Sequence, residues 1–239
     1  MVELQKRGRL AEYAYEYTKG LLFAGTLQPG QKVRVEEMVT RLNTSRQPVM
    51  DAFKRLAAEG FLEIIPQVGC RVVVPKMAEI TDFFLIFSAV EGLAADLAAA
   101  RRTPHEIDGL RAINERIGRY LDVGHEQATV ARAYRQHNRE FHGALHVMSH
   151  SATVERLAQG LWDRGDFYVG CLPNGESAFA QRIVEGHAEH ADIIHAIERG
   201  DGDAARELME AHIRAFGKST CGHCIGADAA AGIGVTSRG

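Results

Sequence analysis

The sequence lacks the features that mark membrane-bound, secreted and disulfide-stabilised proteins. No uninterrupted run of about 18 apolar residues occurs in the 239-residue chain, so we expect no membrane-spanning segment. The N-terminus shows no charged-then-apolar-then-small pattern, so we expect no signal peptide. The four cysteines (Cys70, Cys171, Cys221 and Cys224) fit no small disulfide framework and are expected to be thiols. Together these absences predict a cytoplasmic protein.

Two further absences concern catalysis. The chain has no glycine-rich nucleotide-binding loop, and no Asp or Glu stands in a recognisable catalytic motif. We therefore predict that the protein is not an enzyme and assign no catalytic residue.

Charge and histidine are distributed unevenly along a chain long enough for two domains. Residues 1–76 contain 12 Lys/Arg against 8 Asp/Glu, a net charge of +4, whereas the rest contains 16 against 23, a net charge of −7. All 11 histidines occur from His105 onward. Because a basic surface attracts phosphate, any contact with nucleic acid is expected in the first domain.

The most informative segment is 43–60. Ser45 can cap a helix, and Pro48 suits the first turn of that helix because its missing N–H is not needed there. Val49, Phe53 and Leu56 recur at helical spacing and predict a buried face, which leaves a basic, polar face exposed. This arrangement is typical of a recognition helix in the DNA major groove.

The flanking segments support this interpretation. A turn at 28–30 and a short helix at 33–42 precede the segment, and two β-rich runs at 61–65 and 71–74, joined by a Gly-containing loop, follow it. Residues 1–76 are therefore predicted to form a winged helix-turn-helix DNA-binding domain; a helical surface module without nucleic-acid contact is the alternative. Arg46 is the first choice for a guanine contact. The side chains expected to contact DNA are Arg34, Ser45, Arg46, Gln47, Met50, Lys54, Arg55, Gln67 and Arg71.

Residues 77–219 predict an all-helical bundle, so the fold class is mainly α. Thr103 and Pro104 form a helix start. The other expected helices span 80–100, 110–121, 126–148, 152–164, 177–198 and 203–217. The tail, 220–239, is rich in small residues and is expected to be disordered, although its Cys-x2-Cys pair could bind zinc or take part in redox chemistry.

Four polar residues of the bundle predict a metal site. Asn138 and His142 are four residues apart and therefore share one face of a helix, while His190 and His212 lie on two later helices. Three imidazoles and an amide oxygen could hold a divalent transition metal. From spacing alone, surface or hydrogen-bonded core histidines remain the alternative.

Two sets of motifs carry a resemblance to a known family. Residues 29–30, 45–49, 56–60 and 69–72 resemble the DNA-binding domain of GntR-family transcriptional regulators. The helical part is similar to the ligand-binding (FCD) domain of the FadR-type subfamily; the matching residues are 90–92, 138–142, 189–190, 200–201, 204–205 and 211–213. The resemblance covers about residues 8–217.

The resemblance implies that Asn138, His142, His190 and His212 bind zinc or nickel beside a carboxylate effector. Three positions depart from the family pattern. Asn138 stands where Asp is commoner, Phe87 stands where many relatives have Arg, and Met50 replaces a common Arg and could touch a thymine methyl. The side chains expected near the effector are Arg135, Arg139 and His187; His146, His150 and His195 fall outside the implied ligand set.

The predicted function is that of a ligand-responsive repressor of transcription. A homodimer would read a pseudo-palindrome in double-stranded DNA, because one recognition helix covers only a few base pairs. A small carboxylate metabolite would change the DNA affinity, with the join near Pro75 and Lys76 as the moving part. Two alternatives stay open: a metal-dependent enzyme with a DNA-binding appendage, and a regulator for which the metal itself is the signal.

Overall fold

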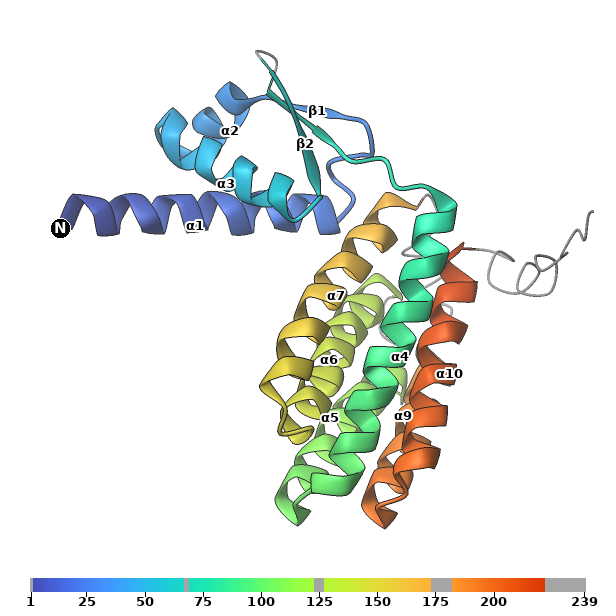
Figure 1. Ribbon diagram of the computed structural model, residues 1–239. Helices are drawn as coiled ribbons and strands as arrows, with labels where there is room; N and C mark the ends of the chain where they lie inside the picture. The colour runs from blue at the N-terminus through green and yellow to red at the C-terminus, as the bar shows by residue number, and fades with distance from the viewer. Residues whose placement is uncertain (1, 67–68, 123–126, 173–181, 222–239) are drawn as a thin grey trace, which may run out of the picture. The chain divides into compact units, whose positions relative to one another are not determined.

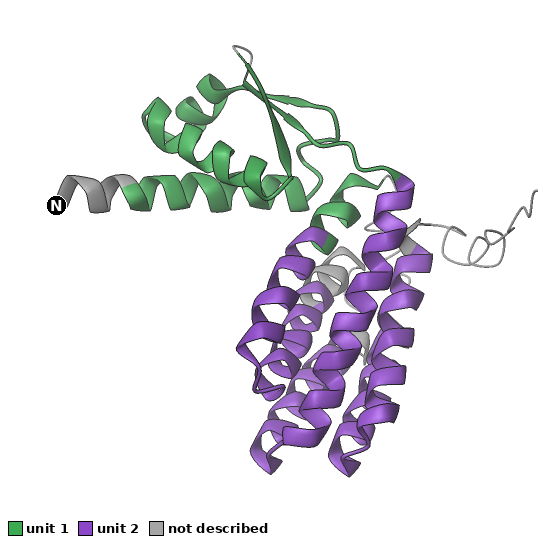
Figure 2. Cartoon of the chain, viewed as in Figure 1, with its two compact units in different colours: residues 1–76, 165–173 green, residues 77–164, 174–239 purple. Residues whose placement is uncertain are grey.

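The chain divides into two compact units. The computed structural model describes residues 2–66, 69–122, 127–172 and 182–221. Unit 1 consists of residues 1–76 together with 165–173, and unit 2 of residues 77–164 and 174–239 (Figure 2). The sequence analysis placed a boundary after residue 76 but did not separate 165–173 from the bundle. The predicted disordered tail lies outside the described residues, apart from 220 and 221, which are helical.

Unit 1 is a winged helix-turn-helix, as predicted (Figure 1). Its elements in chain order are α1 (Val2–Phe23), β1 (Lys32–Val33), α2 (Val35–Leu42), α3 (Arg46–Ala58), β2 (Leu62–Ile65) and β3 (Gly69–Val72). The strands form an antiparallel sheet in the order β1-β3-β2, and β2 with β3 makes the wing. Val33 lies opposite Cys70 in this sheet, so α2 begins two residues later than the predicted helix at 33–42.

The core of unit 1 joins α3 to segments distant in sequence. Val49, Phe53 and Leu56 are 0% exposed, as their spacing predicted. Phe61, just before β2, packs edge-to-face on Phe23 and on Phe167. The ring centroids are 5.5 Å and 5.2 Å apart, respectively. Residues 165–173 therefore complete the hydrophobic core of unit 1, because they supply Phe167.

Unit 2 is a helical bundle, again as predicted (Figure 1). Its helices are α4 (Met77–Arg101), α5 (Pro104–Asp122), α6 (Gln127–Met148), α7 (Ala152–Cys171, whose last seven residues belong to unit 1), α9 (Ile183–Arg199) and α10 (Gly202–Cys221). The predicted start of α5 is confirmed by a capping box. The backbone N–H of Thr103 donates to the Glu106 carboxylate at 2.8 Å, and the N–H of Glu106 donates to the Thr103 hydroxyl at 3.4 Å.

Helix α4 is the most apolar helix for which a membrane span has to be considered. Its 25 residues include an 18-residue window with a mean hydropathy of 1.7, so by length and composition alone it could cross a membrane. In the bundle it packs against α6, α9 and α10, and Ala94, Ala95 and Ala98 are 0% exposed. A helix that is apolar around most of its circumference is typical of a buried core helix as well as of a membrane span. Burial accounts for part of the composition of α4, because Leu85, Ile86 and Leu93 of the same helix are 39–57% exposed.

Candidate DNA-reading face and histidine cluster

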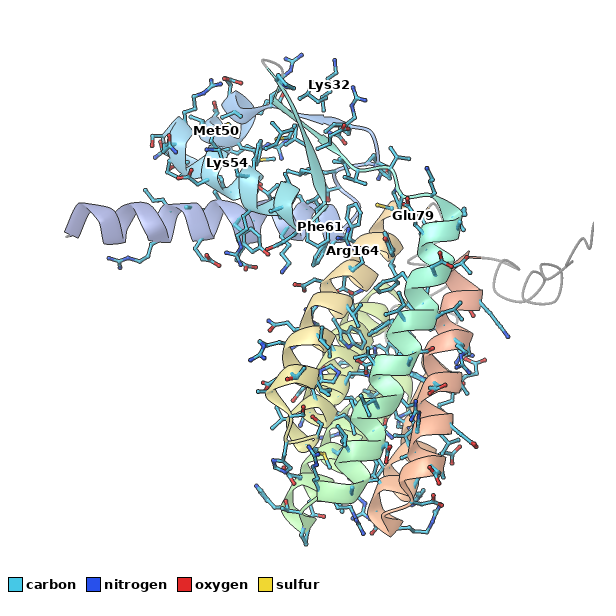
Figure 3. All side chains as sticks on the ribbon, in the orientation of Figure 1. Lys32, Met50, Lys54, Phe61, Glu79 and Arg164 are labelled. Atoms are coloured by element: carbon cyan, nitrogen blue, oxygen red, sulfur yellow. The ribbon has the colours of Figure 1, made fainter. Side chains whose placement is uncertain are left out.

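The exposed side of α3 carries the predicted base readers. Arg46, Gln47 and Lys54 are exposed and Met50 is half-buried (Figure 3). Ser45 is the N-cap residue with extended backbone angles (φ −88°, ψ 167°), but its hydroxyl makes no capping hydrogen bond, contrary to our expectation. The start of α3 therefore presents Ser45, Arg46 and Gln47 together on the surface.

Three of the side chains predicted to contact DNA form ion pairs or hydrogen bonds with acidic residues. The guanidinium of Arg46 forms an ion pair with Glu36 of α2. The amide of Gln47 donates to Asp51 at 2.8 Å, and Arg34 Nε lies 4.0 Å from Glu37 Oε1. All these residues are exposed, so DNA can compete for the basic groups at small cost.

Arg55 is placed differently from the other predicted contacts. Its guanidinium lies 3.5 Å from the ring centroid of Tyr15 and donates to Glu12 Oε2 at 2.9 Å, both on α1, and to Glu59 Oε1 at 3.2 Å. The Tyr15 hydroxyl donates to the same Glu59 carboxylate at 2.7 Å. These contacts give Arg55 a role in fastening α3 to α1.

The small sheet of unit 1 adds a basic residue that was not among the predicted DNA contacts. Arg71 on β3 is half-buried and lies opposite Lys32 on β1, which is exposed (Figure 3). Lys32 escaped notice because β1 has two residues and no strand pattern. Gln67 lies outside the described residues.

In unit 2, three helices bring three histidines together. His142 on α6, His190 on α9 and His212 on α10 are all buried, and one ring nitrogen from each lies within 4.8 Å of the others. Asn138, one turn before His142, is 6% exposed. The structure thus assembles the four residues that the family resemblance singled out.

Several polar atoms in this cluster lack hydrogen-bond partners. Among the described residues, Asn138 Oδ1, His142 Nε2 and both ring nitrogens of His190 are buried without one. An unsatisfied buried polar atom costs about 1–3 kcal/mol, so four at one place call for an explanation. Imidazole nitrogens and an amide oxygen are donor atoms that zinc and nickel accept, so these residues fit a divalent transition metal.

The buried carboxylate of Glu91 is hydrogen-bonded to two histidines of α6. Glu91 on α4 lies 2.7 Å from His142 Nδ1 and 2.7 Å from His146 Nε2, and it accepts a hydrogen bond from Trp162 Nε1 at 3.0 Å. Phe87, in the position where relatives have Arg, packs edge-to-face on Trp162 at 5.3 Å. Neither Glu91 nor His146 was among the predicted site residues. Their signals were the position of Glu91 in the buried helix and the four-residue spacing from His142 to His146.

His212 has a carboxylate of its own. Glu189 Oε2 lies 2.6 Å from His212 Nδ1, and Arg182 Nη2 donates to both oxygens of Glu189 at 2.6 Å. The ring of His190 instead lies flat on Phe141, with centroids 3.9 Å apart. All three rings are therefore held in fixed orientations.

The protonation states also suit a metal. Burial lowers the pKa of His142 to about 4, although Glu91 acts in the opposite direction, and burial holds the pKa of His190 well below its usual value. Burial alone would raise the pKa of Glu91, but the interactions with His142 and His146 lower it to about 2. At neutral pH His142 and His190 are thus neutral imidazoles near an ionised carboxylate, and neutral imidazole is the form that binds metal.

The side chains predicted to contact the effector have different surroundings in the bundle. Arg139 donates to Asp163 at 2.6 Å, Arg135 is half-buried, and His187 Nδ1 meets Asn114 Oδ1 of α5 at 2.9 Å. The Tyr134 hydroxyl, one turn before Asn138, lies against Gly186 on α9.

The fold and the two sites define a class of protein: a regulator with a DNA-binding winged helix and a helical ligand-binding domain. Residues 10–72 match the family described as bacterial regulatory proteins, gntR family, and residues 82–215 match the FCD domain. The chain therefore belongs to the GntR family, with an FCD domain, and is a DNA-binding transcriptional regulator and not an enzyme.

Known relatives agree with this assignment. The chain is 29% identical over 206 residues, 86% of either chain, to the "Probable D-xylose utilization operon transcriptional repressor" of Paenarthrobacter nicotinovorans. It is 24% identical over 196 residues, 81% of either chain, to the "HTH-type transcriptional repressor RspR" of Escherichia coli K12. The fold is shared with E. coli McbR/YncC (TM-score 0.68, 20% identity, 86% of this chain and 93% of that one).

Proposed function

We propose that this protein is a cytoplasmic, homodimeric repressor, released from DNA by a small carboxylate that binds beside a metal ion in unit 2. The observation that carries the proposal is the cluster of His142, His190 and His212 with Asn138. Within it Asn138 Oδ1, His142 Nε2 and both ring nitrogens of His190 are buried without hydrogen-bond partners among the described residues. These four residues would hold zinc or nickel. The bound ion would supply a positive charge to attract an anionic effector.

The DNA-binding side of the proposal rests on α3. Arg46 and Gln47 stand at the exposed start of this helix, where a recognition helix reaches base edges. One such helix reads only a few base pairs, so a two-fold symmetric dimer on a pseudo-palindrome supplies the remaining specificity. The names of the P. nicotinovorans and E. coli relatives support repression as the mode of action.

Arginines of the bundle would complete the effector site. Arg135 and Arg139 were predicted for this role, and Arg182 joins them because it reaches His212 through Glu189. A carboxylate would change the DNA affinity only as far as it binds the DNA-bound and free conformations unequally.

Metal content and metal-dependent stability test the metal site. We expect purified protein to retain zinc or nickel, and His190→Ala to lose it and to show no metal-dependent rise in melting temperature. His195→Ala, an exposed histidine on the same helix, is the matched control. Failure of the wild type to respond to either metal would contradict the proposal.

DNA selection tests the regulator. Genomic fragments bound at near-physiological salt, followed by footprinting, should give a protected pseudo-palindrome. A panel of carboxylates should then weaken binding in metal-loaded protein, with uncharged D-xylose included because of the relative's name. A response to metal alone would instead favour a metal-sensing regulator.

A further inference from the structure

We infer that Glu91 is a positioning residue for the histidine cluster, one that sets the tautomer of His142 and supplies the negative charge that Asn138 lacks. This inference deepens the proposed metal site and rests on it for its function. Glu91 is 0% exposed and lies on α4, a helix that carries none of the four candidate ligands.

The hydrogen bonds of Glu91 determine where protons lie. An ionised carboxylate only accepts hydrogen bonds, so each nitrogen that faces it must carry a hydrogen. His142 meets Glu91 through Nδ1 at 2.7 Å, and His146 meets it through Nε2 at 2.7 Å. His142 is therefore the Nδ1–H tautomer, with a bare Nε2 lone pair. His142 Nε2 is the buried nitrogen for which no partner exists among the described residues.

Three donors make the position of Glu91 well determined. His146, Trp162 and His142 donate to its two oxygens, and Trp162 lies 4.7 Å from the His142 ring. A buried carboxylate is stable only when such donors satisfy it.

The negative charge of Glu91 also compensates for the uncharged amide of Asn138. An amide ligand coordinates through oxygen but carries no charge, so three neutral imidazoles and Asn138 leave a dication uncompensated. Glu91 lies directly behind one of those imidazoles, where a carboxylate increases the basicity of the ligand nitrogen. His146 thus belongs to the site although it does not face the cluster.

The tautomers of metal-free wild-type protein test the inference directly. Long-range ¹H–¹⁵N correlation spectra should show His142 as the Nδ1–H form and His146 as the Nε2–H form. The His142 signals are assigned with His142→Gln, and those of His146 with His146→Gln. A wild-type His142 with hydrogen on Nε2 would overturn the inference, and this reading requires neither metal nor a Glu91 variant.

Glu91→Gln provides the second measurement. An amide can accept from one histidine only and presents N–H groups to the others, so the His142 tautomer should become mixed. Zinc or cobalt affinity, measured by chelator competition, should fall about 10- to 100-fold, as is usual on loss of such a partner. His150→Ala, at an exposed histidine two residues beyond the end of α6, should change neither quantity.

The two proposals fail in different ways. The correct wild-type tautomers without metal binding would refute the metal site and retain the placement of Glu91. Unchanged tautomers and metal affinity within twofold in Glu91→Gln would refute the role of Glu91 and leave the metal site standing.

Discussion

The hydroxyl of Tyr134 on α6 lies against the Cα of Gly186 on α9, with no room for a β-carbon between them. The same face of Gly186 has His212 Cε1 within 3.7 Å of that β-carbon position. Tyr134 stands one turn before Asn138, so this contact fixes the spacing of α6 and α9 beside the histidine cluster.

Gly186→Ala should therefore destabilise unit 2. The added methyl group must displace Tyr134 or α9, at a cost of about 1–3 kcal/mol in the free energy of unfolding. Tyr134→Phe removes the colliding oxygen, so the double variant should recover much of this loss in a double-mutant cycle. Gly143→Ala, a helical glycine with nothing within 4 Å of its β-carbon position, is the control and should be neutral or stabilising. Strict additivity of Gly186→Ala and Tyr134→Phe in chemical denaturation would contradict this account.

Glu36→Gln should strengthen binding to DNA of any sequence. Glu36 pairs with Arg46 at the start of the recognition helix, and its carboxylate also repels phosphate. We expect a rise of about two- to fivefold in affinity for non-specific DNA at low salt, with a reduced ratio of specific to non-specific binding. Glu207→Gln on α10 changes the net charge equally and should have no such effect. Fluorescence anisotropy over a salt series distinguishes them.

Lys54→Ala and Arg55→Ala should separate DNA binding from folding. Lys54 is exposed, and its loss should reduce the salt dependence of DNA binding by about one ion.

Arg55 stacks on Tyr15 and pairs with Glu12, so its loss should lower the stability of unit 1 by about 0.5–1 kcal/mol and leave the salt dependence of DNA binding unchanged. Thermal unfolding and the salt slope, measured on both variants, check the assignment. A reduced salt dependence of DNA binding in Arg55→Ala would show instead that Arg55 contacts DNA.

Cys70 should react slowly with alkylating reagents. It is 1% exposed, and burial raises the pKa of its thiol to about 11. Because the thiolate is the reactive form, its low population at pH 8 slows alkylation at least about 100-fold relative to an exposed cysteine. Mass spectrometry of alkylated peptides, in buffer and in denaturant, gives the ratio. Equal rates in the two conditions would show that the β3 strand opens freely.

Much of the fold was predictable because it is local. The apolar spacing of Val49, Phe53 and Leu56 and the capping residues Thr103 and Glu106 act within one or two turns of a helix. The capping bond expected from Ser45 does not form, which shows that residue type alone does not settle a side-chain rotamer.

The remaining features depend on contacts between distant residues. Glu91 meets His142 across 51 residues of sequence, and the contact of Phe61 with Phe167 spans more than 100. Nothing in the local pattern around either residue reports such a partner. The histidines themselves were predicted from their positions on three helices and from the family resemblance, whereas the carboxylates that contact them became evident only in the structure.

The assignment of residues 165–173 to unit 1 bears on how this chain can be divided by an experimenter. Gly170 approaches the end of α1 so closely that a β-carbon there would lie 2.7 Å from the carbonyl oxygen of Leu22. An expression fragment that stops at residue 76 would lack residues 165–173, so the rings of Phe23 and Phe61 would lose their contact with Phe167. An isolated DNA-binding domain, or a chimera that joins this domain to another ligand-binding domain, must therefore include both residues 1–76 and residues 165–173.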